Sequence, residues 1–432
     1  METKPVLRVG IISDVQAYAY SQDWGMHNCE KAFQMLSEME PKIDVLMDGG
    51  DISDHGNDIR TLEYYLKMRA KYFGKNEPVE ISCAGNHDFW NNKEINPWSQ
   101  EEIYAAFRTA FGESVVDPIR KTIAGYDFIA FSADSRHDWK TLPDVYENLL
   151  RPELEAAVKR DPTKPIFLIS HFQPQDTCSG SIHSGRAGLR KVLNDFPQVV
   201  SFSSHTHCPL EDERCIWQGE FTALNTSTLS YGCIEERCDN VCGPILPFGR
   251  EVIQMMVMDV FPDRLEIHRY NVEDKREIKP DKLWKIDLPY LPSNPVYSFE
   301  RRAAMRKAPE FSPDTKIYFR IDYGYVYLVF DAAQHDDFTH FYRITAEELD
   351  QTGNTVKTFN FRYVGNFFRL KRNQDHRFVF RMPPNTLEKG KTYRYSIYPV
   401  ETFGKEGKPI TLVAPVPPTY TFQNKEEIGP QE

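Results

Sequence analysis

The chain of 432 residues lacks the features that mark several classes of protein. It has no uninterrupted run of apolar residues long enough to span a bilayer, which takes about 18 or more. It also has no excess of positive charge: 52 Lys and Arg stand against 63 Asp and Glu. This balance argues against a protein that binds duplex nucleic acid or an anionic membrane surface. A small phosphorylated substrate remains compatible with it, because bound cations reverse the sign of an acidic site.

Two further absences concern the N-terminus and the cysteines. The first residues, METKPVLRVG, lack the basic-then-apolar pattern of a signal peptide. We therefore expect a cytoplasmic protein, or an exported or periplasmic one if a leader was removed from this chain. Eight cysteines do not reach the density of a disulfide scaffold. Five of them fall between Cys208 and Cys242, where free thiols or loop bridges are favoured over a structural zinc, because the spacings match no common CxxC pairing.

The chain up to about residue 230 alternates short apolar runs with helical patterns. The runs are VLRVGIIS, IDVLMDGG, VEISCAG, DFIAFSA, PIFLIS and VVSFSS, and helices are predicted over 26–39, 58–73, 144–160 and 186–195. Strands that alternate with helices in this way indicate βαβ units and a layered α/β fold. Two later runs, VIQMMVMDVF and RLEIHRYNV, predict a hairpin that pairs antiparallel with the end of that sheet.

A change of pattern after residue 290 predicts a second domain. Residues 291–312 combine prolines with a basic helical patch and are predicted to be a linker between domain 1–290 and the rest. From 313 to 423 the sequence consists of aromatic-rich runs of period two, which predicts an all-β sandwich. Its last runs are similar to the end of a fibronectin type III or Ig-like module. Residues 424–432 are expected to be a flexible tail, and the sandwich is a candidate site for an unidentified partner.

Polar side chains of one chemical kind follow the predicted strands of the first domain. In an open α/β sheet, ligands bind beyond the carboxyl ends of the strands, so these groups are expected to converge although they are far apart in sequence. Any one of them alone is an ordinary helix cap or a hydrogen-bonded histidine. Together, at the same point of successive strands, they indicate a site. The residues are Asp14, Gln16, Asp51, Asn86, His87, Asp88, His171, His205 and His207.

The donor atoms indicate which kind of site this is. Carboxylate, amide and imidazole donors without thiolate suit Mn²⁺, Fe or Zn²⁺ in a reactive centre more than a structural zinc. The donors are too many for one ion that must leave room for a substrate. Two divalent ions about 3.5–4 Å apart that share one bridging carboxylate would use the whole set.

The motif order DxQ, GGD, GNHD, SH and HTH resembles the calcineurin-like metallophosphoesterase superfamily over about residues 6–275. The resemblance implies a layered metallophosphoesterase β-sandwich flanked by helices. It also implies that Asp51 bridges the two metals, and that His87 is the proton donor or transition-state stabiliser, oriented by Asp54. The remaining ligands that it implies are Asp14, Gln16 and His207 for the first metal, and Asn86, His171 and His205 for the second.

Gln16 stands where the pattern of the superfamily, DxH, has histidine. Its amide oxygen is a harder and weaker donor than imidazole, which favours Mn²⁺ or Mg²⁺ at the first position. The alternative is that Gln16 only hydrogen-bonds a metal-bound water. The start GIISDVQ also resembles the manganese-dependent ADP-ribose and CDP-alcohol diphosphatases, in which DxQ stands here. That branch has GNHE where this chain has GNHD, so only the precedent for glutamine carries over.

Loop residues near the site are candidates for substrate contact. Trp24 and Trp90 are candidates to stack on a base or aryl group, or else they cap the core. Arg186 is a candidate to hold a second phosphate, or else it is a solvated charge, and His183 is similarly ambiguous. The arginine that protein phosphatases carry after GDxxD is His55 here.

The predicted function is a dinuclear metal-dependent hydrolase of phosphodiesters or nucleotide diphosphates, with Mn²⁺ favoured. One alternative within the class is a phosphomonoesterase. From another class, the chain could be a catalytically weakened binding or scaffold protein that acts through its β-sandwich.

Overall fold

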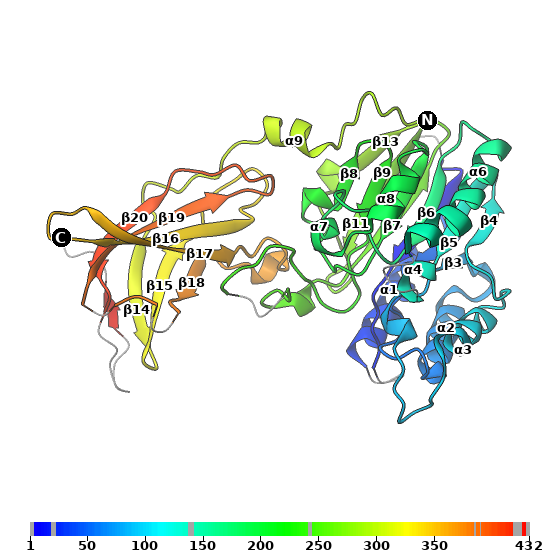
Figure 1. Cartoon of the computed structure of the whole chain (residues 1–432), viewed down its shortest axis with the longest axis horizontal. Helices are drawn as coiled ribbons and strands as arrows, with labels where there is room; N and C mark the ends of the chain where they lie inside the picture. Colours follow the sequence, from blue (N-terminus) through cyan, green and yellow to red (C-terminus); the bar gives the residue numbers. More distant parts are fainter. Residues whose placement is uncertain are drawn as a thin grey trace. The chain divides into compact units, whose positions relative to one another are not determined.

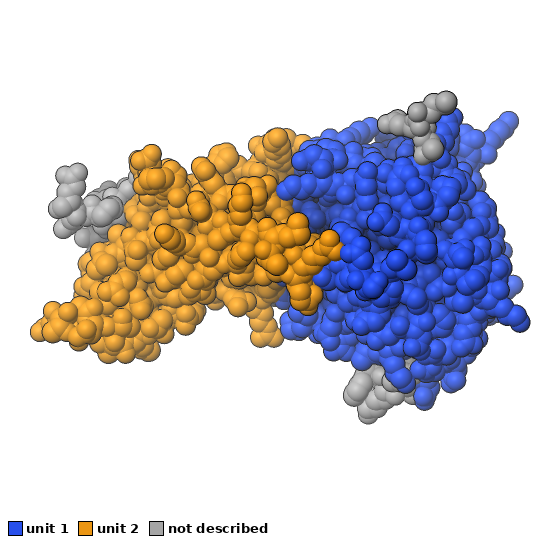
Figure 2. All heavy atoms as spheres, turned by 90° about the horizontal axis from the view of Figure 1, so that it is seen from above, with its two compact units in different colours: residues 1–235, 248–298 blue, residues 236–247, 299–432 orange. Residues whose placement is uncertain are grey.

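The computed structural model describes residues 4–18, 23–136, 142–240, 244–383, 386–388, 390–417 and 426–428. The chain divides into a first unit, residues 1–235 with 248–298, and a second unit, residues 236–247 with 299–432 (Figure 2). The sequence predicts 236–247 within the first domain, whereas the structure groups this segment with the second unit. There, Asp239 and Asn240 accept hydrogen bonds from the backbone amides of Arg362 and Val364. This exchange joins residues more than 100 positions apart, so local sequence gives no sign of it.

Two mixed sheets build the described part of the first unit (Figure 1). The seven-stranded sheet has the order β12-β11-β10-β1-β2-β3, with β13 paired to β11. Its strands are β1 (Leu7–Ile12), β2 (Val45–Asp48), β3 (Val79–Ser82), β10 (Gln254–Val260), β11 (Arg264–Asn271), β12 (Arg276–Glu277) and β13 (Trp284–Asp287). The six-stranded sheet has the order β4-β5-β6-β7-β9-β8. Its strands are β4 (Ile119–Ile123), β5 (Tyr126–Phe131), β6 (Ile166–Ser170), β7 (Val199–Ser203), β8 (Ile216–Gln218) and β9 (Thr222–Asn225).

The strands predicted from the apolar runs form one end of the seven-stranded sheet and the middle of the six-stranded sheet. β1, β2 and β3 pair in parallel, as do β5, β6 and β7. Their carboxyl ends therefore lie at the same edge of each sheet, which is where a site forms in α/β folds. The predicted hairpin is confirmed: β10 and β11 pair antiparallel, and β10 pairs antiparallel with β1.

Apolar side chains on both sides of the seven-stranded sheet form the core. One buried cluster combines residues from the two sheets, such as Val9 and Val45 with Phe128 and Phe167. A second cluster packs the sheet against helices, for example Leu46 against Phe33. The helices of the first unit are α1 (Trp24–Glu38), α2 (Ile59–Phe73), α3 (Gln100–Ala110), α4 (Ala133–Arg136), α5 (Leu142–Val145), α6 (Arg151–Arg160), α7 (Ser181–Ser184) and α8 (Ala187–Leu193), with a π-helical turn over Tyr146–Leu150.

The described part of the second unit is all-β apart from α9 (Phe299–Met305), which lies in the predicted linker, and a short 3-10 helix (Lys371–Asn373). One sheet has the order β18-β15-β14-β21 and the other β17-β16-β19-β20. Their strands are β14 (Ile317–Asp322), β15 (Tyr325–Asp331), β16 (Phe341–Leu349), β17 (Thr355–Val364), β18 (Arg377–Arg381), β19 (Thr392–Val400), β20 (Ile410–Pro415) and β21 (Glu426–Ile428). β21 pairs with β14, where the sequence predicts a flexible tail. Side chains of both sheets, among them Phe330 and Tyr395, share one core.

The described residues contain neither a disulfide nor a membrane-spanning helix. The seven cysteines of this part of the chain are free thiols, and Cys242 lies outside it. No helix that the structure describes is long and apolar enough to cross a membrane.

Candidate metal centre

The predicted ligands occupy an unusual backbone conformation. Twelve non-glycine residues of the described chain have positive φ, and five of them are predicted ligands: Asp14, Gln16, Asp51, His205 and His207, with φ of 52°, 46°, 55°, 64° and 51°. Side chains other than glycine rarely adopt this region, at a cost on the order of 1–3 kcal/mol each. Such strain persists only where the surrounding fold imposes it, and it gathers at functional sites. The strand ends are therefore shaped to present these side chains.

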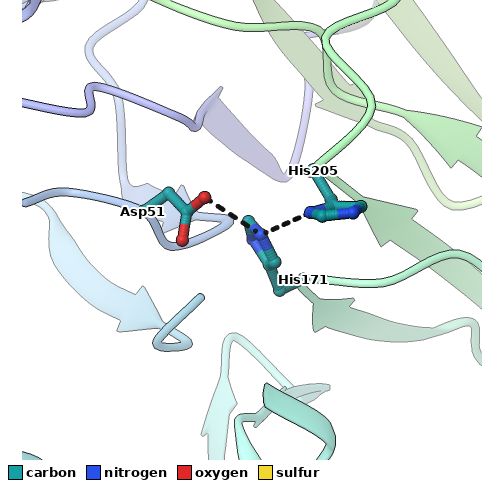
Figure 3. Close-up of side chains that lie close together, drawn as sticks. All are labelled: Asp51, His171 and His205. Carbon is teal, nitrogen blue, oxygen red and sulfur yellow. Dashed lines mark hydrogen bonds and ion pairs between the residues drawn. The ribbon is translucent and has the colours of Figure 1, made fainter. Parts of the chain in front are cut away.

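The second predicted metal site is a group of donors around one histidine nitrogen. His171 Nε2 lies 3.2 Å from Asp51 Oδ2 and 3.3 Å from His205 Nδ1 (Figure 3). It also lies 3.0 Å from Asn86 Oδ1. A single ring nitrogen cannot satisfy three such neighbours, since at most one proton sits on it. A cation between the four atoms would satisfy all of them. Asp51, His171 and His205 also meet the spacing of a metal-ligating group.

The first predicted metal site is a buried carboxylate with no hydrogen bond. Both oxygens of Asp14 are buried and lack a hydrogen-bond partner, and His207 Nε2 lies 3.1 Å from its Oδ1. A carboxylate left in this state is costly, because it has lost its water without gaining donors. A cation at this position would supply the missing partner. The donor chemistry of both groups thus fits two hard divalent ions.

Hydrogen bonds to backbone carbonyls orient two of the imidazoles. His171 Nδ1 donates to Gly49 O at 2.9 Å, and His207 Nδ1 donates to Tyr231 O at 2.8 Å. In each ring this contact places the proton on Nδ1 and leaves the Nε2 lone pair facing the site, as in metal-ligating histidines. The structure therefore fixes which nitrogen of each ring is available to a cation.

Gln16 lies at the site, with its amide nitrogen toward the Asp51 carboxylate. Gln16 Nε2 is 3.5 Å from Asp51 Oδ2, and Gln16 Oε1 accepts from Ser230 Oγ at 3.1 Å. In this orientation the amide oxygen faces Ser230 rather than a metal. Rotating the amide by half a turn would exchange the two atoms, and the Ser230 hydroxyl would then accept from the nitrogen. Both predicted roles of Gln16 are therefore compatible with its surroundings.

Asp54 holds two histidines at once. His87 Nδ1 lies 3.0 Å from Asp54 Oδ1, and His55 Nδ1 lies 3.0 Å from Asp54 Oδ2. The backbone amide of His87 donates to Asp51 Oδ1 at 2.8 Å, which fixes this residue beside the Asp51 carboxylate. Burial lowers the pKa of His87, but the hydrogen bond to Asp54 and the negative charges of Asp51, Asp54 and Asp88 together outweigh it and raise that pKa above its usual value. The imidazolium, the form that donates a proton, is thereby favoured.

Two residues of this region carry roles that sequence reasoning missed. Asp88 accepts from the backbone amides of Asp51, Ser53 and Gly85 at 2.7, 2.9 and 2.9 Å, so it ties the GGD loop to the GNHD loop. His55 shares Asp54 with His87, although the sequence marks it only as a replaced arginine. The motif letters contained both residues, but backbone partners and a shared carboxylate are properties of the folded loops.

Ion pairing within the site changes the proton affinity of its histidines. Burial disfavours the charged form of His171, but the Asp51 carboxylate stabilises it and raises the pKa of His171 to about 10. Burial and the neighbouring positive His171 lower the pKa of His205 well below its usual value. A metal that binds to His171 must therefore displace a proton from the metal-free protein.

The four predicted substrate residues lie at different distances from these donors. Trp90 is 48% exposed and lies against His87, with ring centroids 3.7 Å apart. Trp24 begins α1, and its indole nitrogen donates to Ser230 O at 3.4 Å. Arg186 precedes α8, and its guanidinium lies 3.6 Å from the ring centre of Phe172, the residue after His171. His183 is exposed on α7, with no contact to the metal-binding groups among the described residues.

Residues 7–209 match the profile of the calcineurin-like phosphoesterase family. The matched segment runs from the first residue of β1 to just beyond His207, so it contains every strand end that carries a predicted ligand. Residues 7–209 are thus similar to the calcineurin-like phosphoesterase family, which is the family that the motif order resembles. No curated protein sequence matches the chain.

The solved structures that align with this chain have low identity to it and low TM-scores. The purple acid phosphatase PPD1 from yellow lupin (Lupinus luteus) seeds has a TM-score of 0.46 at 13% identity, over 65% of this chain and 53% of the lupin chain. The 5′-nucleotidase precursor from Thermus thermophilus has a TM-score of 0.33 at 12% identity, over 72% and 62% of the two chains. The chain thus covers about half of the lupin enzyme, and these values transfer no activity.

Proposed function

We propose that this metallophosphoesterase is a dinuclear hydrolase of phosphodiesters or nucleotide diphosphates. The observation that carries the proposal is the pair of donor groups, one around His171 Nε2 and one around Asp14. Asp51 belongs to the first of these groups, and Gln16, which is predicted for the second, lies 3.5 Å from the Asp51 carboxylate, so Asp51 is the candidate to bridge two ions. Asp51, Asn86, His171 and His205 would hold one ion, and Asp14, His207 and, in one of its two orientations, Gln16 would hold the other.

The protein side chains define the rest of the reaction. When bound, two divalent ions would neutralise a phosphate and supply a hydroxide nucleophile. His87 lies beside the bridging carboxylate, and Asp54 fixes its Nδ1, so Nε2 is the atom left to donate a proton to a leaving oxygen. Burial of Asp14, Asp51 and His171 excludes water from the donors. That dry environment strengthens every charge interaction with a bound phosphate.

The proposed substrate class is argued from the exposed aromatic side chains around the site. Trp90 and Tyr18 are exposed aromatic side chains beside His87 and His55. Such rings favour a substrate with a base or aryl group, hence a diester or nucleotide diphosphate. A phosphomonoesterase remains the alternative within the class. The alternative of an inactive scaffold is weakened by the retained pair of His87 and Asp54, because these two residues have no role in metal binding alone.

The preferred metal follows from Gln16. A neutral amide in place of an imidazole is a weaker donor and suits a harder ion, so Mn²⁺ is the proposed native metal at the first position. The two ions and a small phosphorylated substrate are the partners of the first unit in this proposal. The resemblance of the second unit to a fibronectin type III module stays a prediction.

Metal analysis combined with a hydrolysis assay tests the proposal. The purified protein is assayed with added Mn²⁺ on bis(p-nitrophenyl) phosphate, p-nitrophenyl phosphate and ADP-ribose. We expect about two metal ions per chain and Mn²⁺-dependent turnover, both lost in Asp51→Asn. Asp350→Asn, an equal change at an exposed turn of the second unit, serves as the matched control. An absence of bound metal together with no Mn²⁺-dependent turnover of all three substrates would refute the proposed enzyme.

A further inference from the structure

Arg186 is a fixed cation beside the group of donors around His171. Its backbone is clamped to the loop after His171: the Arg186 amide donates to Gln173 O at 2.8 Å, and the Gln175 amide donates to Arg186 O at 3.3 Å. Its guanidinium stacks on Phe172, and the Phe172 ring lies 4.4 Å from that of the predicted ligand His205. One aromatic ring therefore separates the Arg186 guanidinium from a metal-ligating imidazole.

Arg186 has no ion pair among the described residues, although its side chain is held in place. Its Nε is buried and has no hydrogen-bond partner. A guanidinium that lies flat on a ring keeps the N–H groups of its edge in one plane, which is the geometry that binds the oxygens of a phosphate in a bidentate manner. Arg190, in α8, differs in this respect. Its guanidinium also lies over an aromatic ring, that of Trp217, but it forms an ion pair with Glu220.

Two further buried polar groups lie near Arg186. Asp134, on α4 at the carboxyl end of β5, is only 2% exposed, and neither of its oxygens has a hydrogen bond of good geometry. The hydroxyl of Tyr146 is also buried, and it interacts with Asp134. Burial raises the pKa of Asp134 to about 7, although Arg186 and His171 act against this. Asp134 is therefore a weak counter-charge, and unused hydrogen-bonding capacity remains beside Arg186.

We propose that Arg186 forms an anion subsite that binds a second phosphate of the substrate, next to the phosphate held between the metals. Arg186 is then a specificity-determining residue that separates nucleotide diphosphates from simple diesters. The inference rests on the proposed function and deepens it, because it names the diphosphate as the favoured member of the substrate class. It predicts a loss confined to substrates that carry two phosphates.

The test compares two substrates with the Mn²⁺-loaded full chain. We expect Arg186→Ala to lower kcat/KM for ADP-ribose on the order of 10- to 100-fold, as for the loss of a charge-assisted hydrogen bond, and to change kcat/KM for bis(p-nitrophenyl) phosphate less than about threefold. Arg186→Lys, which keeps the charge without the planar fork, should fall between Arg186→Ala and the wild type. The matched control Arg190→Ala, on the helix that follows Arg186 and also over an aromatic ring, should leave the ratio of the two values unchanged.

Equal losses on both substrates, or no loss on ADP-ribose, would overturn the subsite. If the wild type hydrolyses neither substrate, the proposed function fails, and the subsite is judged by calorimetric binding of inorganic pyrophosphate and phosphate to the Mn²⁺-loaded protein. Weaker binding of pyrophosphate alone in Arg186→Ala would support the subsite, and equal binding in both proteins would reject it. Thermal unfolding of each variant verifies the fold, and Arg186→Lys takes the place of Arg186→Ala if the latter does not fold.

Discussion

The indole of Trp90 lies against the imidazole of His87, with ring centroids 3.7 Å apart and ring planes inclined by 37°. His87 is thus held on one side by an aromatic face and at Nδ1 by Asp54. An imidazole with two such restraints has little freedom to leave the orientation in which Nε2 meets a substrate. The contact makes Trp90 a positioning residue for the proposed proton donor, in addition to a candidate platform for a substrate ring.

Trp90→Ala is expected to lower kcat about 2- to 10-fold, the range that corresponds to losing one aromatic pair. The loss should be larger for ADP-ribose than for p-nitrophenyl esters, because nitrophenolate leaves without needing a proton. Trp90→Phe should recover part of the rate. Steady-state kinetics on both kinds of substrate measure the difference, and an equal loss on both would show that Trp90 does not act through His87.

Asp54→Asn should slow the reaction without removing metal. The neutral amide offers one acceptor where the carboxylate offers two, so His55 and His87 compete for it. We expect kcat to fall on the order of 100-fold, the lower end of what general acid catalysis contributes. His55→Gln, which changes only the other partner of Asp54, should have a smaller effect. A parallel fall in metal content would assign Asp54 to metal binding instead.

Gln16→His restores the residue of the DxH pattern and tests how Gln16 acts. If Gln16 is a ligand, the imidazole should tighten binding of the first metal by about tenfold or more and change which metal gives the highest rate. Competition with a fluorescent chelator measures the affinity. Ser230→Ala is the companion variant, because it removes the hydrogen bond that now holds the amide oxygen away from the metals. No change in affinity or preference in Gln16→His would mean that Gln16 is not a ligand.

The buried carboxyl of Asp134 should make the free energy of unfolding depend on pH. Burial raises the pKa of this carboxyl to about 7 in the folded chain, above its usual value of 3.8. Between these two values the folded chain binds more protons than the unfolded chain, so the free energy of unfolding falls as the pH rises through this window. Asp134→Asn should remove that loss and be more stable than the wild type at pH 8, by an amount on the order of 4 kcal/mol at most. Near pH 4 the two should agree.

Urea unfolding of both metal-free proteins at several pH values measures this effect. Only the transition of the first unit should respond, because Asp134 belongs to that unit. Curves of stability against pH that run parallel for the wild type and Asp134→Asn would contradict the prediction.

The parts of the fold that sequence predicted well are those with strong periodicity. β1, β2, β3, β5, β6 and β7 are continuous apolar runs, and the hairpin β10–β11 follows a visible turn. The short strands β8 and β9 lie in a cysteine- and polar-rich stretch with no such pattern, and they were not predicted. α3 was missed too, although Ser99 and Glu102 form a capping box at its start. The capping box is visible in the local sequence, but no apolar run of a predicted strand lies next to it.

The site shows the same division between local and long-range information. Asp14, Asp51 and His171 each end a readable strand, so their convergence followed from topology. The interaction of Arg186 with Phe172, the burial of Asp134 and the shared carboxylate of Asp54 depend on loop paths and on side-chain packing. Such contacts join segments that no periodicity relates. Sequence therefore predicted which polar side chains lie near one another better than the contacts that surround Arg186, Asp134 and Asp54.

The left-handed backbone at five predicted ligands has a consequence for how this site persists over generations of mutation. Glycine adopts that conformation without strain, so replacing His205 or His207 by glycine would relieve the backbone while destroying the donor. At these positions a substitution that stabilises the backbone would remove a donor atom of the predicted metal site. Asp51, Gln16 and His207 each make a hydrogen bond in this structure, but both oxygens of Asp14 make none. If these five residues are metal ligands, as we propose, binding of the ions would offset the strain of their backbone.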